Sequence, residues 1–137
     1  MSQQSGIEFR VDFSGRWYGP DGKEVTDASL YFLTHNLRFD DSGYFIAMSF
    51  GPTKVIAEDV PFVITGVARD PDDEHSLILT IMDGTNEKLF PETLSIKGEH
   101  FYCMVRSGRI PARFLPEARQ EIEKYVDRKG QDLYLTI

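Results

Sequence analysis

The chain has 137 residues, which fits one domain, and its 41% hydrophobic and 27% charged residues are typical of a soluble globular protein. Its net charge of −7 argues against nucleic acid or an anionic membrane as partner, because both are bound through a surplus of Lys and Arg. The single cysteine, Cys103, excludes an intrachain disulfide. Since no signal peptide pattern is present, we expect one cytoplasmic domain over residues 1–137, with the polar segment 1–6 disordered.

The N-terminal part of the chain predicts a strand, a small hairpin and a helix. Apolar and polar residues alternate over Ile7–Phe13, which is the period of a half-buried strand. Arg16–Tyr18 and Lys23–Val25 flank Gly and Pro turn residues and predict a hairpin. Thr26 or Asp27 is suited to cap a helix over 28–36. The expected apolar stripe of that helix comprises Leu30, Phe32, Leu33 and Leu37.

Between Leu37 and Met82 the sequence predicts an antiparallel sheet. Four short apolar runs are separated by Gly, Pro, Asp and Ser, as in a series of hairpins. Pro61 marks a bend or an edge position, Gly66 a bulge, and Arg69–His75 a charged loop. The runs are Leu37–Phe39, Tyr44–Phe50, Lys54–Val67 and Leu77–Met82.

The last third of the chain predicts two more hairpins and a second helix. Asp83-Gly84 is a strong turn signal, and Leu94–Ile96 and His100–Arg106 flank a turn around Gly98. A helix is expected over Pro116–Lys129, ended by Gly130, and a final strand over Asp132–Ile137. The predicted fold is α+β: an antiparallel meander with two helices packed on it.

The sequence contains one local basic cluster that could bind an anion. Arg106, Arg109 and Arg113 lie close together around Gly108, and three guanidiniums can grip a phosphate or carboxylate. The alternative is an ordinary strand-to-helix connection with solvated arginines. The sequence carries no cofactor, nucleotide or metal motif.

Other reactive residues have simpler structural explanations. The acidic run Asp70–His75 lacks calcium-loop spacing and fits a solvated loop. His35, His75 and His100 show no metal-ligand spacing, and Cys103 lies in a strand, where a buried thiol is more common than a nucleophile.

Three short segments resemble landmarks of a known family. They are Gly15-Arg16-Trp17-Tyr18, Asp41-Ser42-Gly43-Tyr44 and Ile56-Ala57-Glu58-Asp59-Val60-Pro61-Phe62-Val63. With Arg106–Phe114 and the helix after it, they resemble domain-of-unknown-function family 1285. The resemblance implies an α+β fold of antiparallel sheets with helices, a bacterial source, and a role in signalling or ligand binding. The family has no established catalytic residues to transfer.

These observations favour a noncatalytic module that binds a small anionic ligand or a protein partner. The alternative is a hydrolase, which requires Glu58 or Asp59 to share a pocket with a His. A third hypothesis is a structural role in a homo-oligomer, with Trp17, Tyr18 or Tyr134 exposed at the interface.

Overall fold

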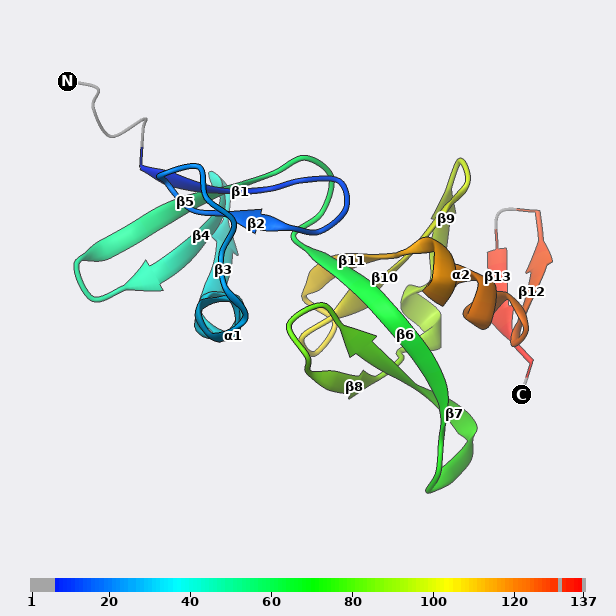
Figure 1. Ribbon diagram of the computed structural model, residues 1–137. Coiled ribbons are helices and arrows are strands. Elements are labelled where there is room, and N and C mark those ends of the chain that lie inside the picture. Colours follow the sequence, from blue (N-terminus) through cyan, green and yellow to red (C-terminus); the bar gives the residue numbers. More distant parts are fainter. Residues whose placement is uncertain (1–6, 131, 137) are drawn as a thin grey trace. The chain divides into compact units, whose positions relative to one another are not determined.

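The computed structural model describes residues 7–130 and 132–136, so segment 1–6, predicted to be disordered, lies outside the described residues. The fold is α+β, with strands predominating. The chain divides into two compact units, unit 1 up to Asp59 and unit 2 from Val60 (Figure 1). That the two units form one domain stays a prediction.

Over its described residues, from Ile7 on, unit 1 consists of a five-stranded sheet and the helix α1, and the strand order is β2-β1-β5-β4-β3. Strand β1 runs parallel to β5, and the other neighbouring strands are antiparallel. The buried apolar residues include Val11, Trp17, Leu33, Ile46 and Val55. The elements are β1 (Glu8–Val11), β2 (Trp17–Tyr18), α1 (Asp27–His35), β3 (Leu37–Asp40), β4 (Gly43–Met48) and β5 (Gly51–Ala57).

Unit 2 has a six-stranded sheet in the order β8-β7-β6-β11-β10-β9 and a C-terminal hairpin of β12 and β13. Its core includes Phe62, Leu79, Val105, Phe114 and Ile122, the last from α2, which packs on β6 and β11. The elements are β6 (Phe62–Asp70), β7 (Asp73–Ile81), β8 (Asn86–Lys88), η2 (Pro91–Thr93), β9 (Ser95–Lys97), β10 (His100–Val105), β11 (Ile110–Phe114), α2 (Pro116–Glu123), β12 (Val126–Lys129) and β13 (Asp132–Leu135).

The predicted strands of the meander are present, but the meander itself is wrong in two respects. Strands β3 to β5 belong to one sheet and β6 and β7 to another, because the chain leaves the first sheet around Pro61, which has no amide to donate to a ladder. Both sheets are mixed, since β1 pairs in parallel with β5, and β6 with β11. Both parallel pairs join strands that are distant in sequence, so the local alternation of apolar and polar residues could not predict them.

Three other expectations need correction. The charged loop over Arg69–His75 is reduced to Pro71-Asp72, because β6 and β7 extend into it as a long hairpin (Figure 1). Ile110–Phe114, expected to be a connection, is strand β11 inside the sheet. The second helix ends at Glu123, because Tyr125 and Val126 favour strand, and β12 follows.

The two units repeat one topology, although no repeat is visible in the sequence. In each unit the first strand (β1 or β6) pairs antiparallel with the next (β2 or β7) and parallel with a later strand (β5 or β11). That later strand pairs with β4 or β10, which in turn pairs with β3 or β9. Paired positions of the sheet of unit 1 can therefore be matched by register to positions of the sheet of unit 2. For example, the pair Met48 and Gly51, which joins β4 to β5, is equivalent to the pair Val105 and Ile110, which joins β10 to β11.

Candidate functional site

The fold gives the three predicted anion-binding arginines different surroundings. Arg106 and Arg109 belong to the turn between β10 and β11, and Arg113 lies within β11. Arg109 is exposed, and its Nε donates to the backbone oxygen of Arg106 over 3.3 Å. Arg113 is only 2% exposed, on a strand flanked by β6 and β10. The structure therefore brings two of the three residues into one turn and places the third inside the sheet.

Arg106 is already held by two carboxylates. Its Nη2 lies 2.5 Å from Asp83 Oδ2, and its Nη1 lies 3.4 Å from Glu87 Oε2. The Asp83 carboxylate is fully buried, and the guanidinium also lies 4.8 Å from the centre of the Phe62 ring. Arg106 and Ser107 have positive φ angles of 54° and 62°, a backbone conformation that non-glycine residues rarely adopt. An anion at Arg106 would have to compete with both carboxylates.

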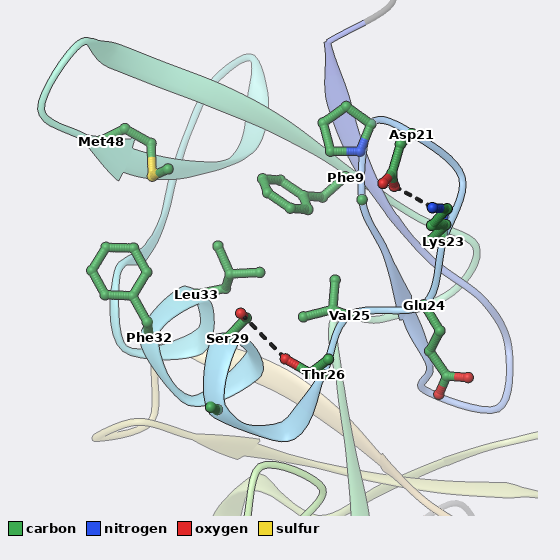
Figure 2. Close-up of a pocket in the computed structure, with 13 residues that line it drawn as sticks. Phe9, Asp21, Lys23, Glu24, Val25, Thr26, Ser29, Phe32, Leu33 and Met48 are labelled. Carbon is green, nitrogen blue, oxygen red and sulfur yellow. Dashed lines mark hydrogen bonds between the residues drawn. The ribbon is translucent and has the colours of Figure 1, made fainter.

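An open pocket lies in unit 1, beside α1. It is a cavity of about 860 Å³, within the ~300–1,000 Å³ range of small-molecule pockets. The wall is contributed by β1, the loop that follows β2, α1 and the end of β4 (Figure 2). Its apolar lining consists of Phe9, Pro20, Val25, Ala28, Phe32, Leu33 and Met48.

The lining of this cavity follows from how α1 packs. Of the four residues predicted to form the apolar stripe of the helix, Leu33 and Leu37 are buried, whereas Phe32 is 52% exposed. Phe32 is therefore not a core residue but part of the cavity wall, opposite Phe9 of β1 (Figure 2). An apolar ligand placed there would cover aromatic surface that water now contacts, which is the driving force of apolar binding.

Charged residues of the loop before α1 also line the cavity. Asp21 Oδ1 accepts a hydrogen bond of 2.9 Å from the amide of Lys23, which fixes the carboxylate on the loop (Figure 2). Lys23 and Glu24 complete the charged part of the lining. Sequence reasoning missed these residues; the available signal was the Asp-Gly turn beside an aromatic helix face.

A second cavity of unit 1, about 520 Å³, bears on the hydrolase alternative. Glu58 lines it, together with Arg10, Asp12 and Tyr18, but no His is among its lining residues. Tyr18 Oη donates to Asp12 Oδ2 over 3.2 Å. Burial acts to raise the pKa of Asp12, but hydrogen bonds from Ser14, Arg16 and Tyr18 outweigh it, so the pKa falls below its ordinary value. Asp12 is therefore suited to stay ionised rather than to donate a proton.

Cys103 and the three histidines lie where their structural explanations predicted. Cys103 is buried, and burial, with a smaller effect of the Glu87 charge, raises the pKa of its thiol to about 12. His35, His75 and His100 are exposed. Within residues 7–130 and 132–136, no group of three or more His, Cys, Asp or Glu side chains is placed to hold a metal.

The prediction that Trp17 is exposed at an oligomer interface is wrong. Trp17 is 2% exposed in the core of unit 1, so it is not available on the surface. Tyr18 is half-buried, and Tyr134 is 47% exposed. The helices that the structure describes are all too short or too polar to cross a membrane.

Two solved structures are similar to this chain over most of its length. One is a DUF1285 family protein from Shewanella baltica OS155, with 18% identity and a TM-score of 0.75 over 86% of this chain and 91% of that chain. The other is a DUF1285 family protein from Silicibacter pomeroyi DSS-3, with 15% identity and a TM-score of 0.76 over 96% of this chain and 81% of that chain. No protein-family model and no curated protein matches the sequence. The chain therefore has the fold of DUF1285 proteins, which confirms the resemblance at the level of the fold.

Proposed function

We propose that this chain is a noncatalytic binding module whose ligand site is the cavity of unit 1. The observation that carries the proposal is the cavity itself: about 860 Å³, open, and lined by Phe9, Phe32 and Met48 among other apolar residues. Sites for small molecules are usually concave and mainly apolar, with a few polar groups that orient the ligand. A module of this kind suits the signalling role that the family resemblance implies.

The chemistry of the lining supports binding rather than catalysis. Thr26 Oγ1 donates to Ser29 Oγ over 3.3 Å, so each hydroxyl is partnered by the other rather than by a general base. A nucleophilic hydroxyl requires an adjacent base such as His, and the lining includes none. We also propose a cytoplasmic location, because the buried free thiol of Cys103 suits a reducing compartment.

The proposal is tested by calorimetric titration of the whole protein with 1-octanol, an apolar probe without charge. We expect saturable binding with a stoichiometry of one, because the alkyl chain covers the exposed side of Phe32. An Ala28→Trp variant should abolish binding, since Ala28 lines the cavity and is exposed, so the larger side chain fills the opening rather than the core.

The matched control is Ala68→Trp. Ala68 is also exposed, but it lies on β6 of unit 2. Binding that survives Ala68→Trp and is lost in Ala28→Trp supports the cavity as the site. Equal binding by both variants, or none by the native chain, would contradict it.

The anion site at Arg106, Arg109 and Arg113 stays a separate prediction. Inorganic phosphate is its probe, and Arg109→Ala is the informative variant, because Arg109 is exposed and makes no ion pair with Asp83 or Glu87. Phosphate binding that is lost in this variant would establish the site without bearing on the cavity.

A further inference from the structure

Because the two units share one topology, the loop that lines the cavity has an equivalent in unit 2. In unit 1 the amide of Gly19 donates to Lys23 O over 2.9 Å, and in unit 2 the amide of Ile81 donates to Thr85 O over 2.9 Å. The Asp-Gly turns inside these loops also match. Gly22 and Gly84 have φ angles of 82° and 87°. Asp21 is therefore the equivalent of Asp83.

The two aspartates are held in the same way. Asp21 Oδ1 accepts from the amide of Lys23 over 2.9 Å, and Asp83 Oδ1 accepts from the amide of Thr85 over 3.0 Å. In both loops one carboxylate oxygen is thus used to fix the turn, and the other oxygen is left for a second partner. In unit 2 that second partner is a cation, because Asp83 Oδ2 binds the guanidinium of Arg106.

At the position in unit 1 that is equivalent to Arg106, the residue is Ser49, which carries no positive charge. Arg106 follows Val105 at the end of β10, where the turn Arg106–Arg109 leads into β11. The equivalent strand end in unit 1 is Met48, and there the shorter turn of Ser49 and Phe50 leads directly into β5. The cavity lies between this strand end and the Asp21 loop, since both Met48 and Asp21 line it (Figure 2).

We propose that the cavity of unit 1 binds a small molecule that carries a guanidinium or primary ammonium group on an apolar body. The cation pairs with Asp21, as Arg106 pairs with Asp83, and the apolar body contacts Phe9 and Phe32. This inference rests on the proposed function, since it names the class of ligand for the same site.

The charges around the cavity agree with a cationic ligand. Asp21 and Glu24 contribute two negative charges to the lining and Lys23 one positive charge. In the part of the chain that the structure describes, no ion pair joins the Lys23 ammonium to Asp21. A carboxylate ligand paired with Lys23 is the competing outcome, and the test is chosen to distinguish the two.

The test compares four probes with one alkyl chain and different head groups: octylguanidinium, octylammonium, 1-octanol and octanoate. Dissociation constants are measured by calorimetry on the whole protein at 150 mM NaCl, where screening suppresses nonspecific attraction to the acidic surface. We expect both cations to bind about tenfold more tightly than 1-octanol, and octanoate more weakly than 1-octanol, since a charge-assisted hydrogen bond adds to apolar contact.

An Asp21→Asn variant locates the effect. Its amide oxygen can still accept from Lys23, so the loop keeps its turn, but the negative charge is lost. We expect this variant to lose the tenfold preference for cations while binding 1-octanol as before. Asp72→Asn, which removes a charge from the exposed β6–β7 turn, should keep the preference.

The outcomes separate the two proposals. Equal affinities for the charged and uncharged probes, tighter binding of octanoate, or an unchanged preference in Asp21→Asn would overturn the cationic ligand while leaving the cavity as a binding site. Binding of none of the four probes would overturn the proposed function as well.

Discussion

Arg106, Arg109 and Arg113 carry the same guanidinium group, yet the fold surrounds each of them differently. The partners of Arg106 are Asp83 and Glu87, which precede it by 23 and 19 residues, so no local pattern indicates the pairing. The basic cluster was visible in the sequence, but the carboxylates that neutralise Arg106 were not. A count of nearby charges is informative about a site only once the tertiary partners are known.

Replacement of Arg106 tests whether this pairing stabilises unit 2. Arg106→Ala leaves the fully buried Asp83 carboxylate without its cation, and such a loss costs about 3 kcal/mol. We expect the free energy of unfolding in urea to fall by about that amount. Arg109→Ala is the control and should change it by less than ~0.5 kcal/mol, since Arg109 is exposed. Equal effects of the two variants would contradict the structural role of Arg106.

The burial of the Cys103 thiol can be tested by its reactivity. Because burial raises the pKa of the thiol to about 12, almost none of it is thiolate at pH 8, and its access to solvent is blocked. We expect a disulfide reagent such as Ellman's to leave the folded protein unmodified at pH 8 and to modify one thiol per chain in denaturant. Rapid modification of the folded protein would show that the thiol is accessible.

Among the elements, those with local signals were predicted well and those that depend on distant partners were not. The Asp83-Gly84 turn and the hairpin around Gly98 follow from glycines with positive φ angles of 87° and 60°. Strand β11 was not predicted, because a segment that contains Pro111 and Arg113 and follows Arg109 does not have the pattern of an interior strand. Its place is fixed by parallel pairing with β6, a strand far away in the sequence.

Two glycines with different roles give a test at the scale of elements. Gly84 has a φ of 87°, whereas Gly66 has an ordinary φ and its added Cβ would meet Thr80 at 3.5 Å, a normal contact. We expect Gly84→Ala to destabilise the protein by about 1 kcal/mol, since a Cβ is strained in that conformation. Gly66→Ala should change stability by less than half of that in urea unfolding. The reverse order would show that the bulge, and not the turn, needs glycine.

At the scale of the whole molecule, the repeated topology is the feature that the sequence concealed. By strand register and turn hydrogen bonds, Asp21-Gly22 is equivalent to Asp83-Gly84, and Pro52 is equivalent to Pro111. The residues around these positions differ between the two units. Similar strand orders can be formed by different side chains as long as the apolar pattern is retained. The difference that bears on the proposed function is the turn after β4, where Ser49 occupies the position of Arg106 and the adjacent Met48 lines the cavity.

The distribution of buried residues predicts unequal stability of the two units. Among the described residues, six of the buried apolar side chains lie in unit 1 and seventeen in unit 2. Each buried Val, Leu, Ile or Phe side chain among them stabilises the fold by about 1.5–3 kcal/mol relative to exposure. In native-state hydrogen exchange we therefore expect the slowest amides in β6, β7, β10 and β11, and faster exchange in β1 to β5. Slowest exchange in unit 1 would contradict this.

The proposal that the cavity of unit 1 binds a cationic ligand is tested by a two-dimensional NMR titration of the whole protein with octylguanidinium chloride. It predicts saturable amide shifts centred on the cavity of unit 1, at Phe9, Asp21, Lys23, Ser29 and Met48. Shifts that do not saturate, or that centre on the turn Arg106–Arg109 in unit 2, would contradict it.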